Sequence, residues 1–369
     1  MVRARSKAVL AGAMALAVLN APALAGAATG HPAATHAPVT HHGPRCLVGP
    51  RANLAGCNLA HRNLAGANLV GANMARTNLE GANLDRARLA GANLDRANLD
   101  GAQLVGAMVR GASLVAATAS GANFANATLT GANIAGAHLL GASVPGIRTG
   151  GLRGLPASEP RLVGLVRGYL VGPKVDLTHA NLARVLLWNH NLAGANLTGA
   201  DLAGASMAND LLAGTNLTGT TLKGIISGGL KGVPVGVPAS WHLISGYLLG
   251  PSAVLGDAHL ERVNLAGVDL AGSYLVGAIF TGSHVVDVDL SGANLDEASC
   301  SGATFTNDVV SGTSFAGADL TDTHSSGLLG TPRVLPTGWT ISGGSFIERP
   351  PTTTTTSTTS TTTTTTRPG

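Results

Sequence analysis

The chain has 369 residues, of which 45% are hydrophobic, only 3% are aromatic and 11% are charged, and its formal net charge is +4. Length alone would allow two globular domains, but a chain with a dense internal repeat does not follow that rule. Three of the 23 basic residues lie within the first seven positions, in a segment that we expect to be removed. Without them the formal net charge falls from +4 to +1, so the basic balance of the full sequence says little about partners.

The N-terminal segment has the three parts of a secretory signal peptide. Basic residues at positions 3, 5 and 7 precede an apolar run from Ala8 to Leu19. Ala23-Leu24-Ala25 supplies small residues for cleavage, and Ala25-Gly26-Ala27 is the alternative. The apolar run is short for a membrane span, and no later stretch of about twenty apolar residues follows. We therefore predict a secreted or envelope-associated protein without a membrane span in the mature chain.

A linker rich in histidine and proline follows at residues 28–45. It contains His31, His36, His41 and His42. Four histidines could hold a divalent metal, but the segment lacks carboxylates and shows no sign of order. We predict a disordered linker and no metal site.

From Ala52 to Val144 the chain repeats a five-residue unit without a change of phase, as in Gly66-Ala67-Asn68-Leu69-Val70. Five steps along an α-helix rotate the chain by about 140° net, so the leucines would spiral around it. Five steps along a straight strand would place equivalent residues on opposite faces. The period therefore predicts short extended edges with a corner every five residues.

The residue type at each position of the unit predicts which way the position faces. Leu or another apolar residue occupies all nineteen central positions of this block, and Ala lies two residues earlier in sixteen of them. Positions two apart on an extended edge share a face, so both should point inward. The residue between them is usually Asn and should point outward, and Gly suits the corner. The pattern predicts a parallel β-solenoid.

Three cysteines are an odd number for an exported chain. Cys57 occupies an inward small position, and Cys46 lies just before the first unit, so a disulfide between them is one possibility. Cys300 occupies an inward central position, where we expect a buried and inert side chain.

Two further blocks follow, and the segments between blocks are themselves repeats. Each restart lies 33 residues after the last central residue of the previous block. The interruptions share Gly-Leu, two prolines and Gly-Tyr-Leu, and a shorter version of their last part precedes the first unit at Cys46–Pro50. The predicted organisation is a signal peptide (1–27), a linker (28–45), block 1 (46–146), an interruption (147–174), block 2 (175–224), an interruption (225–252), block 3 (253–326), a cap-like segment (327–349) and a tail (350–369).

The interruptions carry most of the aromatic residues, and two interpretations of these side chains are open. As structural elements, they would cover the apolar interior and the unpaired strand edges at the end of a block. As a site, they would line a ligand groove on the aromatic-bearing loops. The candidate residues are Tyr169, Trp241, Tyr247 and Trp339. The sequence also leaves open whether one axis continues through the interruptions, and we favour a single stack with side loops.

The C-terminal tail from Pro350 to Gly369 consists mainly of threonine and contains no apolar residue. We predict a disordered, extended tail. Such tracts in exported proteins can carry O-linked sugars or act as spacers, and an undecorated tail is the alternative.

The repeat resembles the pentapeptide-repeat family, whose consensus of Ala, Asp or Asn, and Leu is matched by Ala67-Asn68-Leu69, Ala195-Asn196-Leu197 and Ala293-Asn294-Leu295. The resemblance implies a right-handed, four-sided parallel β-helix with four units, or twenty residues, per coil. Some cytoplasmic members of the family block type II topoisomerases by mimicking duplex DNA with an acidic face. The nearly neutral mature chain and the signal peptide argue against that activity and against nucleic acid as a partner.

With twenty residues per coil, two polar residues at inward positions should lie on adjacent coils. His190 and Asp210 are twenty residues apart. Because a buried charge needs a partner, we expect their side chains to form a hydrogen bond, directly or through water. A remnant of a catalytic dyad is the alternative, but no nucleophile falls beside the pair.

The sequence contains none of the common phosphate-binding, nucleophile-elbow or zinc motifs. An enzyme also needs convergent side chains in a concavity, which an interior filled with Leu and Ala does not offer. We therefore expect a non-enzymatic exported scaffold without a cofactor. The alternative is an extracellular module that binds carbohydrate or protein. The expected partner is an envelope protein or polysaccharide.

Overall fold

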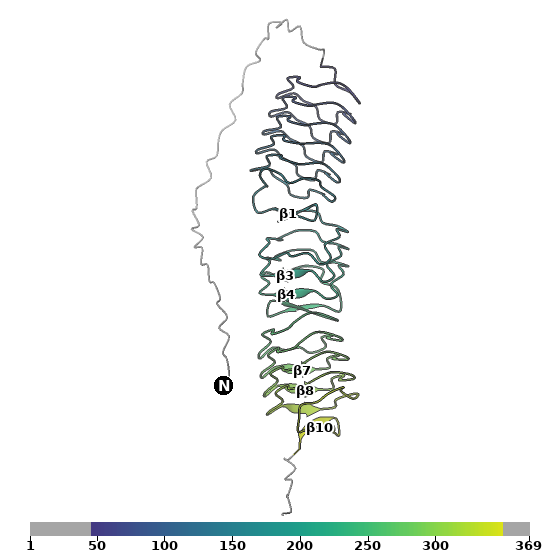
Figure 1. Cartoon of the computed structure of the whole chain (residues 1–369), viewed down its shortest axis with the longest axis vertical. Coiled ribbons are helices and arrows are strands. Elements are labelled where there is room, and N and C mark those ends of the chain that lie inside the picture. Colours follow the sequence, from purple (N-terminus) through teal and green to yellow (C-terminus); the bar gives the residue numbers. More distant parts are fainter. Residues whose placement is uncertain (1–45, 350–369) are drawn as a thin grey trace, which may run out of the picture. The chain divides into compact units, whose positions relative to one another are not determined.

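The structure is a computed structural model that describes residues 46–349. The regular structure of these residues is all β, and they include no α-helix and hence no helix that could cross a membrane. The predicted signal peptide, the predicted linker with its histidines and the predicted Thr-rich tail lie outside the described residues. Figure 1 shows the described part as a stack of coils.

The coils are held together by parallel pairing between residues twenty positions apart. Asn53 pairs with Asn73, and Asn73 pairs with Asn93. The Leu54 N–H donates to the Asn73 carbonyl at 2.7 Å, and the Asn73 N–H donates to the Ala52 carbonyl at 2.9 Å. Twenty residues contain four five-residue units, so every unit lies against the equivalent unit of the next coil.

Most edges are so short that they pair through a single residue, and only a few are longer strands. β3 (Ser206–Ala208) pairs with β4 (Ile226–Gly228). The other set is a three-stranded parallel sheet of β7 (His284–Val286), β8 (Thr304–Thr306) and β9 (His324–Ser326).

The interior is one continuous apolar core, and it follows the predicted inward positions. Leu69, Ala72 and Leu79 have no exposed surface, and Phe280 and Phe315 in the third block are also buried. Outward asparagines have a structural task that the sequence pattern did not reveal. The Asn83 side-chain oxygen accepts the N–H of Asp85 at 3.0 Å, and equivalent bonds recur along the stack. Each such bond pairs a backbone donor of the corner.

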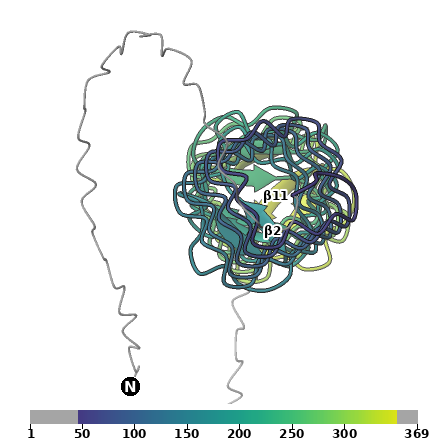
Figure 2. The same ribbon diagram turned by 90° about the horizontal axis from the view of Figure 1, so that it is seen from above.

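The three interruptions fold as antiparallel β-hairpins with the same register. The first is β1 (Gly164–Val166) with β2 (Tyr169–Val171), and the second is β5 (His242–Ile244) with β6 (Tyr247–Leu249). The third is β10 (Trp339–Ser342) with β11 (Ser345–Glu348). Seen along the stack, β2 and β11 lie inside the ring formed by the coils (Figure 2).

The tip of each hairpin is tied to the coil before it by two repeated hydrogen bonds. A glycine carbonyl at the tip accepts a leucine N–H, as in Gly168 with Leu152 at 3.1 Å and Gly246 with Leu230 at 3.0 Å. An inward hydroxyl accepts the N–H of the residue two after that glycine. These pairs are Thr149 with Leu170, Ser227 with Leu248, and Ser325 with Phe346, at 2.9, 2.9 and 2.7 Å.

The parallel ladder continues past both internal hairpins. Arg148 pairs with Asp176, and Ile226 pairs with Val254. Each of these pairs is 28 residues apart, which is one coil of twenty with eight residues added. An ion pair between Arg148 and Asp176, at 2.5 Å, lies across the first of these steps. Blocks 1, 2 and 3 therefore share one ladder.

The glycine at the hairpin tip should be less replaceable than a corner glycine. Gly246 has a φ of +79°, and a Cβ atom there would lie 3.2 Å from the backbone nitrogen of Leu230. Gly267 has a similar φ of +71° with nothing within 4 Å of that position. Gly267→Ala should cost only the conformational term of about 1–2 kcal/mol. Gly246→Ala should cost more, because the backbone must also move away from Leu230. Thermal unfolding of the two variants measures the difference, and equal losses would contradict the close approach.

Candidate functional site

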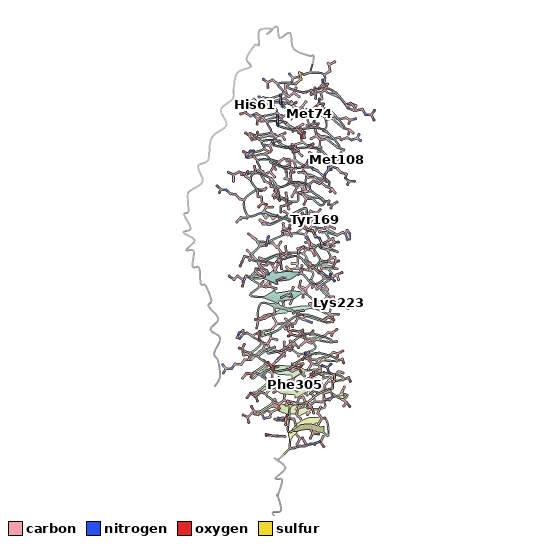
Figure 3. The ribbon with its side chains drawn as sticks, viewed as in Figure 1. His61, Met74, Met108, Tyr169, Lys223 and Phe305 are labelled. Atoms are coloured by element: carbon pink, nitrogen blue, oxygen red, sulfur yellow. A yellow bond between two sulfur atoms is a disulfide. The ribbon has the colours of Figure 1, made fainter. Side chains whose placement is uncertain are left out.

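The aromatic residues of the hairpins act mainly as structural contacts. The Tyr169 hydroxyl accepts the N–H of Asn181 at 3.1 Å, and the Tyr247 hydroxyl accepts the N–H of His259 at 3.1 Å. Each tyrosine thus joins its hairpin to the block that follows. In Figure 3, Tyr169 lies at the level where the first block meets the second.

The two tryptophans of the later interruptions are not an open ligand surface. Only 8% of Trp241 is exposed, and a Cβ atom at Gly250 would lie 2.2 Å from its ring, so the indole packs directly over that glycine. Trp339 is half-buried and packs against the core. The structure therefore does not support the prediction that Trp241 contacts a ligand. Its ring covers the apolar interior at the second hairpin.

The expected hydrogen bond between the His190 and Asp210 side chains is wrong, although both residues occupy the predicted coil positions. Asp210 Oδ1 accepts the backbone N–H of His190 at 2.8 Å. The imidazole turns away from the interior, and its Nδ1 lies 3.1 Å from the carbonyl oxygen of Trp188. Asp210 is fully buried, and its Oδ2 has no hydrogen-bond partner among residues 46–349. The backbone N–H of His190, and not its imidazole as predicted, is therefore the hydrogen-bond donor to Asp210.

Asp308 repeats this arrangement in the third block without any histidine. Its Oδ1 accepts the backbone N–H of Val288 at 2.8 Å, and its buried Oδ2 also lacks a partner. Burial raises the pKa of Asp210 to about 7 against the opposing effect of the His190 N–H. Burial likewise raises the pKa of Asp308 to about 7. Each carboxyl accepts a backbone N–H of the adjacent coil, and the charge of Asp287 adds to the raised pKa of Asp308.

The structure joins Cys46 and Cys57 in a disulfide bond, which closes the segment before the first coil onto its second unit. Cys300 is a free, buried thiol. Burial and the nearby charge of Asp319 raise the pKa of this thiol to about 12. A thiol of this kind is unreactive at neutral pH.

A surface groove that the sequence did not indicate lies between the first hairpin and block 2. Its volume is about 390 Å³, and its lining includes Glu159, Leu162, Trp188, His190 and Asn191. Trp188 is 57% exposed, which is unusual for a residue of this size. The available signal was that two large side chains lie two residues apart. Trp188 follows the central Leu187, and His190 occupies the inward small position of the next unit, where Ala is the rule.

No group of three or more His, Cys, Asp or Glu side chains among residues 46–349 could hold a metal ion. The other grooves lie along corners of block 1 and at the third hairpin. One of them, with a volume of about 600 Å³, is lined by Arg76, Asp95 and Arg96 together with Asn93, Val115 and several Ala and Gly residues. Its acidic side chain, Asp95, accepts the Ser113 hydroxyl and lies in the same lining as two arginines.

A stack of five-residue units with twenty residues per coil defines a repeat protein of the β-solenoid class. The sequence profile of pentapeptide repeats matches the chain in eight copies, over residues 52–89, 78–114, 110–144, 175–209, 252–282 and 286–324. These matches cover more than half of the chain. The protein belongs to the pentapeptide-repeat family.

Solved structures similar to the chain include other pentapeptide-repeat proteins. HetL, involved in heterocyst differentiation regulation in the cyanobacterium Nostoc sp. strain PCC 7120, is 24% identical, with 76% of this chain and 90% of HetL covered and a TM-score of 0.26. Rfr23 from the cyanobacterium Cyanothece 51142 is 27% identical, with 28% of this chain and 88% of Rfr23 covered and a TM-score of 0.21. QnrB1, a plasmid-mediated fluoroquinolone resistance protein, is 13% identical, with 77% and 89% covered and a TM-score of 0.18. A search of curated proteins found no match.

The two buried carboxyls should make the protein less stable as the pH rises from about 4 to 7. Their pKa in the folded protein is about 7, against an ordinary value of 3.8. Within this window the unfolded chain has lost the proton that the folded protein keeps, so the free energy of unfolding falls with pH. The fall should be on the order of 2–4 kcal/mol for each carboxyl.

Asp210→Asn together with Asp308→Asn should flatten this slope and raise the melting temperature at pH 8. Thermal unfolding across the pH range provides the measurement. Asp201→Asn is the matched control, because Asp201 lies at an outward position of block 2 where Asn is common. A slope that survives in the double variant would contradict the assignment.

The disulfide should stabilise the N-terminal end of the stack by about 3 kcal/mol, given the short loop that it closes. Reduction should lower the melting temperature of the protein and should leave a Cys46→Ser variant unchanged. Mass spectrometry of the unreduced protein should show two hydrogen atoms fewer than after reduction.

Because Cys300 is buried, alkylation of the folded, unreduced protein should leave the Cys300 thiol unmodified, and rapid alkylation would contradict its burial.

Proposed function

We propose that the protein is an exported, non-enzymatic scaffold built on a right-handed, four-sided solenoid. The observation that carries the scaffold role is the continuous apolar interior beneath one shared ladder. Such an interior keeps outward positions and hairpins at fixed separations. The four units in each twenty-residue coil support four sides, and the hand of the coil follows from the resemblance to the family.

Two features support export. The N-terminal residues have the pattern of a signal peptide. The bond between Cys46 and Cys57 suits an oxidising compartment, since structural disulfides persist mainly outside the cytosol. In this proposal the mature chain starts near residue 28 and the Thr-rich tail separates the stack from a neighbouring surface. An envelope protein or polysaccharide is the proposed partner.

DNA mimicry is the less favoured proposal, because acidic and basic side chains alternate on the surface of the first block. A groove of about 600 Å³ there is lined by Asp95 as well as by Arg76 and Arg96. A mimic of a phosphate backbone needs a face of one sign, since nucleic-acid-binding proteins meet DNA with basic residues. The described surface of this groove offers both signs together.

Fractionation of the native host tests the export proposal. We expect the protein in the envelope or the medium, with a mature N-terminus after residue 25 or 27, and N-terminal sequencing of the recovered protein locates the cleavage site. Deletion of residues 1–27 should leave the protein in the cytoplasm. An uncleaved wild-type chain found only in the cytoplasm would refute the proposal.

A further inference from the structure

The groove at the first hairpin contains a fixed, exposed aromatic platform. The Trp188 Nε1–H donates to the Ser206 hydroxyl at 2.7 Å, on the neighbouring coil. This bond ties the edge of the indole to the stack, while more than half of the side chain remains exposed to solvent. An exposed ring held in one orientation can stack on a flat apolar surface of a ligand at a low cost in side-chain entropy.

Polar groups of several kinds surround this ring. Because the Trp188 carbonyl can only accept, the bond at 3.1 Å assigns a proton to Nδ1 of His190, and in the neutral imidazole Nε2 is then an acceptor. A Cβ atom at Gly164 would lie 3.4 Å from that Nε2, so the ring borders strand β1. Asn191 uses its side-chain oxygen to accept the Ala193 N–H at 3.0 Å, and that bond does not involve its amide nitrogen. The groove therefore offers both donors and acceptors.

The single charged group in the lining is a carboxylate. Glu159 Oε1 accepts the Leu165 N–H at 3.1 Å, which fixes the side chain on the hairpin. No lysine or arginine lines the groove. An anionic ligand would meet this carboxylate without a compensating cation, which is unfavourable.

The second hairpin shows that the fold does not require these residues. Its backbone repeats the first hairpin with an offset of 78 residues, as the matching bonds of Tyr169 and Tyr247 demonstrate. At the positions equivalent to Glu159, Trp188 and His190 it carries Val237, Ala266 and Val268. The same hairpin and the same junction thus form without the carboxylate, the indole or the imidazole. A structural need does not explain why the first junction has all three.

We propose that the groove formed by Glu159, Leu162, Trp188, His190 and Asn191 binds a neutral saccharide chain. A sugar ring offers an apolar C–H face for the Trp188 indole and hydroxyl groups around its rim for the acceptors and donors of the groove. Hydroxyls both donate and accept, which matches the mixture of a carboxylate, an imidazole acceptor and an amide. A volume of about 390 Å³ falls in the range of small-ligand sites and accommodates one or two sugar rings of a longer chain. This proposal concerns binding alone and does not depend on where the protein is located.

Isothermal titration of the full mature chain with cellohexaose and chitohexaose tests the proposal. We expect saturable binding of at least one of these neutral probes and no binding of acidic polygalacturonate hexamer. Trp188→Ala should weaken binding by about tenfold or more, as expected for an aromatic anchor. Tyr274→Ala is the matched control, since Tyr274 is a similarly exposed aromatic, at 47%, outside the groove. It should bind like the wild type.

A triple variant gives the first junction the residue types of the second junction at three positions. Its substitutions are Glu159→Val, Trp188→Ala and His190→Val. It should fold, because Val288 already donates its N–H to Asp308 as His190 does to Asp210. Binding should be lost while the melting temperature stays close to that of the wild type. Absence of binding to both neutral probes, equal binding by Trp188→Ala, equal loss in Tyr274→Ala, or preference for the acidic hexamer would each overturn the proposal.

Discussion

The structure depends on the parallel stacking of each residue on its equivalent twenty positions away. Neighbouring strands of a sheet lie about 4.8 Å apart, so an inward side chain is confined between the equivalent side chains of the coils on either side. Most inward positions therefore hold Ala or Leu, and an added or missing methylene group cannot be absorbed by a shift of one coil alone. The repetition in the sequence is the consequence of this confinement.

The same confinement decides which polar groups the interior accepts. Several hydroxyls at inward small positions donate to a backbone carbonyl 23 residues earlier, as Thr77 does to Leu54 and Thr215 does to Leu192, both at 2.7 Å. Thr313 and Ser273 repeat this bond. A hydroxyl needs only one such partner, and the coil supplies it. A carboxyl has two oxygens, and the interior satisfies one of them through the backbone amide of the adjacent coil, so the second oxygens of Asp210 and Asp308 remain without a partner.

The five-residue period was sufficient to predict the all-β class, the parallel pairing and the direction of nearly every side chain within the blocks, because these properties follow from local spacing. The hairpins were not predictable in this way. Their sequences lack the period, and their geometry depends on contacts across the interior, such as the Gly168 carbonyl with the Leu152 N–H. The orientation of His190 was missed for a related reason. The backbone N–H of His190 occupies the Asp210 carboxylate, and the imidazole bonds to the Trp188 carbonyl instead. A pattern of residue types does not show whether a backbone N–H or a side chain will bind a given carboxylate.

The two internal hairpins and the third hairpin differ in the contacts that they make with a following coil. The internal copies have a tyrosine whose hydroxyl accepts an N–H of the next block, and they bury Val171 and Leu249 completely. The third copy has Ser345 in place of the tyrosine, and the residue equivalent to Val171 is Ile347, which is 45% exposed. The Ser345 hydroxyl donates instead to the Ser325 carbonyl of the preceding coil at 2.7 Å.

The terminal hairpin thus retains the contacts with the coil before it and lacks those that would connect it to a following one. A regular block can change little without loss of packing, whereas a hairpin or its junction can exchange outward residues and keep its two anchoring bonds. A site that needs several different side chains in one place is therefore easier to build at a junction than within a block. The groove beside Trp188 lies at such a junction, where the constraint of equal neighbours is relaxed.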